Sequence, residues 1–133
     1  MHREVPRILV VDDEPDMCWA LERILQTAGY EVSAATSASE ALELVAKETH
    51  AVAFVDAKLP DADGRGLTAL IQRVSPDTVT VLVSGYYDRE DEQVIRGLEQ
   101  GLFERFIAKP FEAELVRMVA HMAVERATPE GEQ

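Results

Sequence analysis

The sequence of 133 residues predicts one α/β domain, in which a doubly wound parallel sheet carries helices on both faces. Two observations support this fold class. Short apolar runs alternate five times with stretches whose apolar residues recur at helical spacing. In addition, four of the five runs end on polar residues, as expected where parallel strands deliver side chains to one edge of a sheet. The alternation alone does not determine the order of the strands.

The first strand is predicted at 8–11, where apolar residues precede Asp12 and Asp13. Pro15 then favours the first turn of a helix, and apolar residues recur at helical spacing through the following stretch. Gly29 suits the position that follows the end of a helix. The chain therefore begins with a strand, an acidic turn and an amphipathic helix.

The second and third strands are predicted on either side of a capped helix. Apolar and polar residues alternate weakly at 30–35, and Ser37 and Glu40 then have the spacing of a capping box. The run 51–56 is apolar except for its last residue, Asp56. A run of this length and composition is expected to be a strand covered on both faces.

The third helix follows a loop at 59–64 that contains proline and glycine. Pro76 and Asp77 interrupt the chain before a fourth strand at 79–83, which ends on Ser84 and Gly85. The third helix is predicted around Leu67, Leu70 and Ile71.

The last two helices flank a fifth strand, predicted at 103–108. The fourth helix is expected at 88–99, because its acidic start suits the positive end of a helix dipole and Gly101 suits its end. The fifth helix is expected at 112–126. The predicted inner faces of the two helices carry Val94, Ile95 and Leu98, and Leu115, Val116, Val119 and Met122.

Composition argues against several classes of function. The net charge of −12 disfavours a nucleic-acid surface, which needs clustered Lys and Arg. No run is long enough to span a membrane, residues 1–7 lack the apolar run of a signal peptide, and Cys18 has no partner for an internal disulfide. We therefore expect a cytoplasmic protein that binds neither nucleic acid nor membrane. Its domain is expected at 6–126, with flexible ends at 1–5 and 127–133.

The polar residues at the strand ends suit one kind of chemistry. Carboxylates gathered at one edge repel each other unless a cation lies between them, and Mg²⁺ prefers a few carboxylates together with water. A carboxylate beside Mg²⁺ can attack phosphorus to form an acyl phosphate, whose charge a fixed cation would balance. The residues in these places are Asp12, Asp13, Asp56, Ser84 and Lys109.

Each of these residues also has a simpler interpretation. Taken alone, Asp12 and Asp13 would only cap a helix, and Asp56 and Ser84 would be turn residues. Lys109 alone would be a surface lysine. Their shared placement at the strand ends favours the phosphoryl and metal site.

Four segments in a fixed order make the pattern more specific: 8–14, Asp56 with 59–64, 84–86 and 106–111. This pattern resembles the receiver domain of response regulators in two-component signalling, and is similar to chemotaxis-type single-domain regulators. The resemblance implies a flavodoxin-like sheet of strand order 2-1-3-4-5. It also implies that Asp56 accepts a phosphoryl group from a sensor histidine kinase or a histidine phosphotransfer protein.

The resemblance further implies a Mg²⁺ (or Mn²⁺) site. Asp13 and Asp56 would bind the metal directly, together with the backbone carbonyl of Lys58, and Asp12 would act mostly through water. Lys109 would pair with the phosphoryl group, and its peptide bond to Pro110 would be cis.

The same resemblance implies a switch. Ser84 would move toward the phosphoryl group and Phe106 would turn inward, although plain core packing is an alternative for Phe106. Gly85 leaves room beside the site, and Tyr86 would line its mouth or only its rim. The fourth helix, fifth strand and fifth helix would then signal to a downstream partner or output domain, with homodimerisation through this face left open.

Two departures from the family pattern stand out. Lys58, two residues after the expected phosphoacceptor, is either an exposed loop lysine or a residue that sets the lifetime of the acyl phosphate. The segment 101–106 is one residue longer than in the commonest receivers. It resembles a subgroup often joined to hybrid kinases or HD-type phosphodiesterases.

Three other functions remain to be weighed. A phosphohydrolase of the haloacid-dehalogenase type would place an Asp-x-Asp pattern after the first strand, where this chain has Asp12-Asp13-Glu14. A phosphate-independent interaction domain would not need its acidic, hydroxyl and lysine positions intact. A nucleotide-binding fold would need a glycine-rich loop after the first strand, and none is present.

Overall fold

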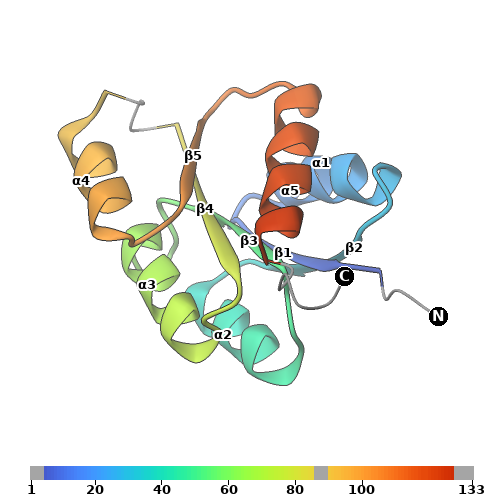
Figure 1. The fold of residues 1–133 in the computed structure, drawn as a ribbon, viewed down its shortest axis with the longest axis horizontal. Coiled ribbons are helices and arrows are strands. Elements are labelled where there is room, and N and C mark those ends of the chain that lie inside the picture. Colours follow the sequence, from blue (N-terminus) through green and yellow to red (C-terminus); the bar gives the residue numbers. More distant parts are fainter. Residues whose placement is uncertain (1–4, 86–89, 128–133) are drawn as a thin grey trace.

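The computed structural model describes residues 5–85 and 90–127, which form a five-stranded parallel sheet of order β2-β1-β3-β4-β5 (Figure 1). The strands are β1 Arg7–Val11, β2 Glu31–Ala35, β3 Val52–Asp56, β4 Val79–Ser84 and β5 Arg105–Ala108. The helices are α1 Pro15–Thr27, α2 Ala38–Lys47, α3 Gly64–Val74, α4 Glu92–Gln100 and α5 Ala113–Ala127. The predicted fold class and the strand order implied by the resemblance are both confirmed. The ends expected to be flexible fall almost entirely outside the described residues, as do Tyr86 and Asp88.

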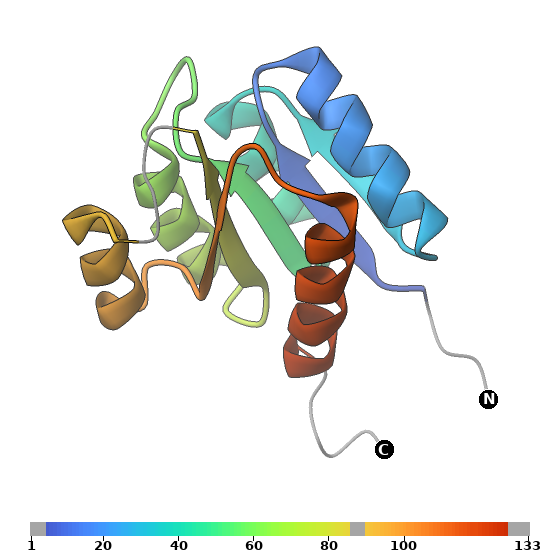
Figure 2. The ribbon, with the colours of Figure 1, turned by 90° about the horizontal axis from the view of Figure 1, so that it is seen from above.

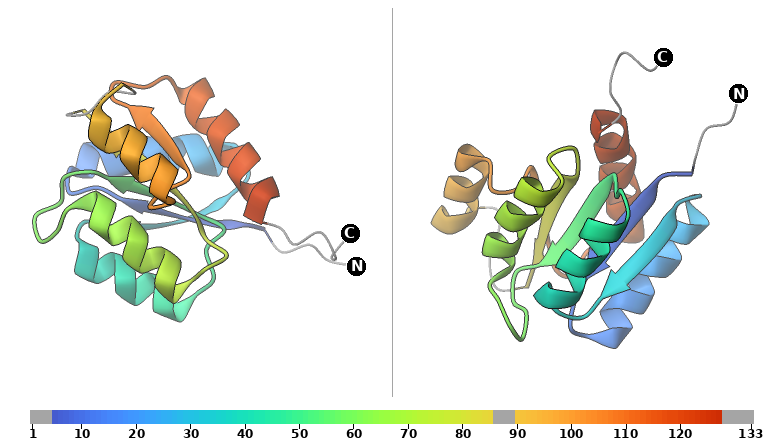
Figure 3. Two further views of the ribbon diagram at one scale, coloured as in Figure 1. Left: turned by 60° about the vertical axis from the view of Figure 1, so that its left-hand side comes forward. Right: turned by 90° about the horizontal axis from the view of Figure 1, so that it is seen from below.

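Helices cover both faces of the sheet (Figures 1 and 3). Because successive strand residues point to opposite faces, Val10 and Phe54 pack under α1 and α5, whereas Leu9 and Val55 pack under α2 and α3. Every residue of β3 is buried. The apolar composition of this central strand is thus explained by cover on both sides.

The strand register brings the polar strand ends together. Val11 of β1 pairs with Val55 of β3, so the next residue of each strand, Asp12 and Asp56, emerges at the same edge. Asp56 pairs in turn with Val83, directly before Ser84. The sheet therefore gathers the expected functional residues at the carboxyl ends of its strands.

Helix α4 is shorter than predicted, because it begins at Glu92 rather than at 88. The Asp91 carboxylate accepts a hydrogen bond from the backbone N–H of Gln93 at 2.8 Å and so caps the helix. The predicted inner face is wrong for two of its three residues, since Ile95 is 43% exposed and Leu98 37% exposed.

The position of α4 depends on one close contact. The ring of Phe103 lies against Gly97, where a Cβ atom would overlap it, and Phe103 is fully buried beside Val94. The helix thus rests on the row formed by Val94 and Gly97, and the apolar residues beside that row face outward. Helix α4 lies near the β4–β5 edge, away from α1 and α2 (Figure 2).

Other expectations need smaller corrections. Strand β5 begins at Arg105 instead of 103, so Phe103 belongs to the preceding loop. Leu70 is 44% exposed and Met122 41% exposed, because the buried rows of their helices are formed by other residues. Those rows are Gly64, Leu67, Thr68 and Ile71 in α3, and Val116, Val119, Ala120 and Ala123 in α5. Across 5–85 and 90–127, no helix is long and apolar enough to cross a membrane.

Candidate functional site

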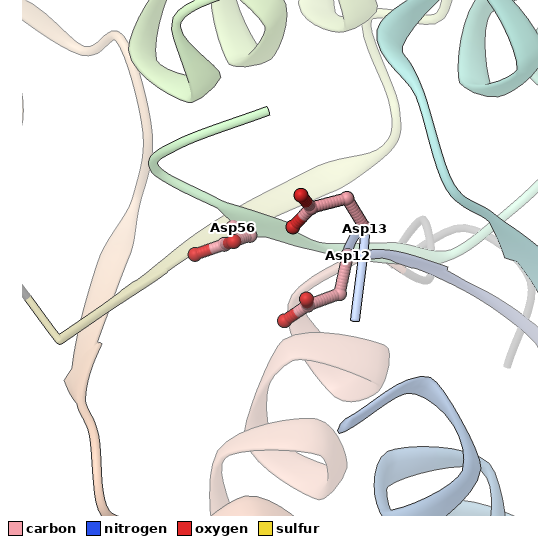
Figure 4. Close-up of side chains that lie close together, drawn as sticks. All are labelled: Asp12, Asp13 and Asp56. Carbon is pink, nitrogen blue, oxygen red and sulfur yellow. The ribbon is translucent and has the colours of Figure 1, made fainter. Parts of the chain in front are cut away.

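Three carboxylates converge beyond the ends of β1 and β3. Asp12 and Asp13 follow β1, Asp56 ends β3, and all three point into the same space (Figure 4). Each offers an oxygen atom, and these atoms lie within 4.8 Å of one another. Asp12 and Asp56 are buried, whereas Asp13 is exposed. The site is therefore open to solvent on the side of Asp13.

Lys109 supplies the positive charge of this cluster. Its Nζ lies 3.0 Å from Oδ2 of Asp12, 3.4 Å from Oδ1 of Asp56 and 3.9 Å from Oε1 of Glu14. The lysine follows β5, and its backbone N–H donates to the carbonyl of Ser84 at 2.8 Å. The peptide bond between Lys109 and Pro110 is cis, as the resemblance implied.

The electrostatics of the cluster are unbalanced. Burial, together with the charge of Asp12, raises the pKa of Asp56 above its ordinary value, even though Lys109 and the backbone N–H of Lys58 act in the opposite direction. Burial alone would lower the pKa of Lys109, but its hydrogen bond and charge interaction with Asp12, reinforced by Asp56, raise that pKa. One partly buried lysine, Lys109, thus faces a surplus of negative charge.

These residues fit a hard divalent cation. Magnesium is bound by a small number of carboxylate oxygens and carbonyl groups, with water completing the shell. The cluster offers carboxylate oxygens on an open side, and a dication would offset the repulsion from Asp12 that adds to burial in raising the pKa of Asp56. The carboxylates that could hold such a cation are those of Asp12, Asp13 and Asp56.

The space beside the carboxylates is a cleft of about 470 Å³. Its walls combine the acidic cluster with the loop that follows β3. The lining residues are Asp13, Glu14, Asp56, Lys58, Leu59, Pro60, Gly85 and Lys109. Glu14, Leu59 and Pro60 were not proposed individually from the sequence, although they lie in the segments 8–14 and 59–64 that carry the family pattern.

The loop after β3 approaches the site through Gly64. The backbone N–H of Gly64 donates to the carbonyl of Ala57 at 2.8 Å, and a Cβ atom here would overlap the backbone of Asp56. Glycine therefore allows α3 to begin directly against the strand that carries Asp56. Lys58 in the same loop is exposed and lines the cleft.

The expected switch residues lie on the next two strands. Ser84 is buried at the end of β4, and Gly85 lines the cleft with the Lys109 side chain nearby. Phe106 of β5 is 7% exposed and packs with Leu82 under α4. Tyr86 lies outside the described residues.

Comparison with known proteins identifies the family. The sequence model of the response regulator receiver domain matches residues 8–121, most of the chain. The chain belongs to the response-regulator receiver-domain family. It is therefore a signalling domain of two-component type.

Relatives of this receiver domain include longer regulators. The chain is 31% identical to the C4-dicarboxylate transport transcriptional regulatory protein DctD of Rhizobium meliloti, over 91% of this chain and 26% of that protein. It is 32% identical to the response regulator protein PilR of Pseudomonas aeruginosa, over 96% and 28% of the two chains. The chain thus spans about a quarter of the length of these relatives.

Solved structures agree with this assignment. A CheY-like receiver domain from Methanospirillum hungatei superposes with a TM-score of 0.83 at 27% identity, covering 92% of this chain and 97% of that one. The receiver domain of an HD domain-containing protein from Pseudomonas fluorescens gives a TM-score of 0.87 at 27% identity, covering 100% and 96%.

Proposed function

We propose that Asp56 is the phosphoacceptor of this receiver domain and that Mg²⁺ held by Asp13, Asp56 and the carbonyl of Lys58 assists the transfer. The observation that carries the proposal is the convergence of three carboxylates within 4.8 Å beside a partly buried lysine, Lys109. Such a cluster supplies both a nucleophile and the charges that a transferred phosphoryl group requires.

The reaction follows from the residues present. A carboxylate oxygen of Asp56 attacks the phosphorus of a phosphohistidine, the P–N bond breaks, and the departing imidazole nitrogen takes up a proton. Bound Mg²⁺ would neutralise charge on the phosphoryl oxygens. Lys109 would move its ammonium group from Asp56 toward the new phosphoryl group while keeping its bond to Asp12. The donor would be a sensor histidine kinase or a histidine phosphotransfer protein.

The output would be a change of conformation rather than a released product. Ser84 would donate a hydrogen bond to the phosphoryl group, and Phe106 would keep the inward position that it already has in this structure. Helix α4 lies over Phe106, and with β5 and α5 it would contact a downstream partner or output domain. The phosphoryl group then shifts the population between two arrangements of this face.

Exposed apolar residues support the choice of this face. Ile95 and Leu98 on α4, and Met118 and Met122 on α5, are between 37% and 55% exposed. We propose that nucleic-acid binding, where a longer regulator has it, belongs to another domain, because this domain carries a net charge of −12. Dimerisation through the same face and a cytoplasmic location remain predictions.

The test is to incubate the protein with Mg²⁺ and acetyl phosphate and to measure its intact mass. We expect one phosphoryl group on the wild type and none on Asp56→Asn, while Asp77→Asn, an exposed carboxylate distant in sequence, behaves as the wild type. Removing Mg²⁺ with a chelator should abolish the adduct. An adduct that survives in Asp56→Asn would overturn the assignment of the phosphoacceptor.

The same experiment separates the rival functions. Repeated turnover of a generic phosphate ester would favour a phosphohydrolase. Absence of both an adduct and a response to a beryllofluoride mimic would favour a phosphate-independent interaction domain. The rate at which the adduct decays in the wild type and in Lys58→Ala would show whether Lys58 sets the phosphoryl lifetime.

A further inference from the structure

Asp61 connects the loop between β3 and α3 to the start of α2, which is distant in sequence. Its Oδ1 accepts a hydrogen bond from the backbone N–H of Ala38 at 2.9 Å, and its Oδ2 accepts one from Ser39 at 3.1 Å. These two N–H groups hold the pKa of the Asp61 carboxyl below its usual value. The carboxylate of the β3–α3 loop is therefore charged at neutral pH and bonded to the start of α2.

Helix α2 needs this distant acceptor. The Ser37 hydroxyl accepts from the backbone N–H of Glu40 at 3.2 Å, and Glu40 reaches back to the N–H of Thr36 at 2.8 Å. This local cap leaves the N–H groups of Ala38 and Ser39 without an intrahelical acceptor, as at the start of any helix. Asp61 satisfies both, and its negative charge suits the positive end of the helix dipole.

The other side of the connection is a wall of the cleft. Lys58, Leu59 and Pro60 line the cleft, and Leu59 is buried. The backbone N–H of Leu59 donates to the carbonyl of Ala62 at 3.2 Å, so Pro60 and Asp61 lie in the bend that this bond closes. The bonds from Asp61 to α2 therefore hold the bend that directly follows Lys58.

The segment before α2 borders the acidic cluster. The carbonyl of Ala35, which ends β2, accepts a hydrogen bond from the backbone N–H of Asp12 at 3.0 Å. Only Thr36 and Ser37 separate Ala35 from α2. Asp61 thus ties the wall that carries Lys58 to the segment that is bonded to Asp12.

We propose that Asp61 is a positioning residue. Its two hydrogen bonds to the first turn of α2 hold the cleft wall formed by residues 58–60 against the carboxylate cluster, in the geometry that binds Mg²⁺. This inference rests on the proposed function, to which it adds a residue outside the lining of the cleft. Losing the clamp should free the turn at 58–62 and weaken metal binding before any phosphoryl group arrives.

The test compares Asp61→Ala with Asp77→Ala, which removes the same charge from an exposed turn between α3 and β4. Calorimetric titration should show Mg²⁺ bound about tenfold more weakly by Asp61→Ala, at the lower end of the effect of losing a group that orients a metal ligand. Asp77→Ala should match the wild type. In the metal-free protein, amide hydrogen exchange at Ala38 and Ser39 should be faster in Asp61→Ala alone.

Asp61→Asn provides the conservative variant, because it keeps one acceptor oxygen. It should bind Mg²⁺ more tightly than Asp61→Ala and protect one of the two amides. Unchanged Mg²⁺ affinity in a variant whose amides have lost protection would overturn the clamp and leave only a helix cap. If Asp61→Ala does not fold, the same comparison is made between Asp61→Asn and the wild type.

The test of Asp61 can fail independently of the test of phosphorylation at Asp56. The titration and the amide exchange need no phosphoryl transfer. A wild type that binds Mg²⁺ without becoming phosphorylated would overturn the role of Asp56 while the clamp is still measured. Normal phosphorylation of the wild type with equal Mg²⁺ affinity in Asp61→Ala would overturn the clamp alone.

Discussion

Polar side chains are buried at both ends of the parallel sheet, but the two groups differ in charge. At the carboxyl end, Asp12 and Asp56 share one lysine, Lys109, and Asp13 lies beside them. At the amino end, His50 precedes β3 and Thr78 precedes β4, and both are almost fully buried. The first group carries surplus negative charge, whereas the second is neutral.

The amino-end group is fully paired. The Nδ1 of His50 faces the carbonyl of Glu48 at 3.0 Å and therefore carries the proton, and its Nε2 accepts from the Ser33 hydroxyl at 3.2 Å. The hydroxyl of Thr78 donates to the carbonyl of His50 at 2.7 Å and accepts from Ser75 at 2.7 Å. Burial lowers the pKa of His50, which keeps the ring neutral.

The difference shows how one sheet separates stability from function. Neutral donors and acceptors satisfy each other at the amino end, so that end joins β2, β3 and β4 without needing a ligand. The carboxyl end satisfies its hydrogen bonds but carries surplus negative charge, which a cation would balance. In the part of the chain that the structure describes, no buried polar side-chain atom lacks a hydrogen-bond partner.

The largest expected effect is at the carboxyl end, for Gly64→Ala. The new methyl group would overlap the backbone of Asp56, which cannot rotate away as a side chain can. We expect a loss of about 3 kcal/mol in the free energy of unfolding and weaker Mg²⁺ binding. Urea unfolding with and without Mg²⁺ measures both.

Gly66→Ala is the matched control, because a Cβ atom there meets nothing within 4 Å. In the interior of α3 this change should stabilise the protein by about 0.5–1 kcal/mol. Equal effects of the two substitutions would show that α3 does not press on Asp56.

The second-largest effect is expected at the amino end of the sheet, for Thr78→Val. The substitution keeps the shape of the side chain and leaves the His50 carbonyl and the Ser75 hydroxyl without their partner. We expect a loss of about 2 kcal/mol in unfolding free energy, with Mg²⁺ affinity unchanged. Thr27→Val at an exposed position is the control. A large loss of Mg²⁺ affinity in Thr78→Val would mean that the two ends are coupled.

In the absence of Mg²⁺, Asp56→Asn is expected to have a smaller effect, and to increase the free energy of unfolding where Gly64→Ala and Thr78→Val lower it. The pKa of Asp56 is raised in the folded state, so stability falls as the pH rises from the unfolded value of 3.8 through the folded pKa. Where the wild-type carboxylate is charged, the uncharged amide should therefore increase the free energy of unfolding.

Thermal melting at neutral and acid pH measures this gain. The advantage of Asp56→Asn should disappear at a pH below 3.8, where the wild-type carboxyl is protonated in both states. Saturating Mg²⁺ should also reduce the stability advantage of Asp56→Asn, because the metal would bind and stabilise the folded wild type. A variant less stable than the wild type at neutral pH would contradict the imbalance of charge.

The smallest expected effect is the pH dependence contributed by His50. Its pKa is lowered in the folded state, so stability is lost as the pH falls from the ordinary value of 6.5 toward the folded pKa. We expect the free energy of unfolding to fall as the pH is lowered from roughly 7.5 to 5.5. Chemical unfolding across this range should show it in the wild type and in His121→Gln, an exposed histidine, but not in His50→Gln.

Local patterns predicted most of the fold and the main site residues. Asp12, Asp13, Asp56 and Lys109 could be found because each directly follows or ends a strand with a clear apolar pattern. His50 could not be found in this way, since a single histidine among scattered ones has no ligand spacing. Its role depends on partners from β2 and from the turn before β4.

The outward residues of α4 were missed for a related reason. Helical spacing alone allowed Val94, Ile95 and Leu98 to share the inner face. The rotation of the helix is determined by Phe103, which packs against Gly97 from the loop before β5. A contact between a loop and a glycine leaves no periodic signal.

The sequence by itself determined the α/β class, the strand and helix order and the residues at the carboxyl edge. It could do so because these features depend on periodicity within short segments and on the common edge of parallel strands. Only the tertiary structure decided that Lys109 pairs with Asp12 as well as Asp56, that Asp61 caps α2 and that His50 is buried. These pairings join residues far apart in the chain, and their distances depend on strand register and helix packing, which no local pattern records.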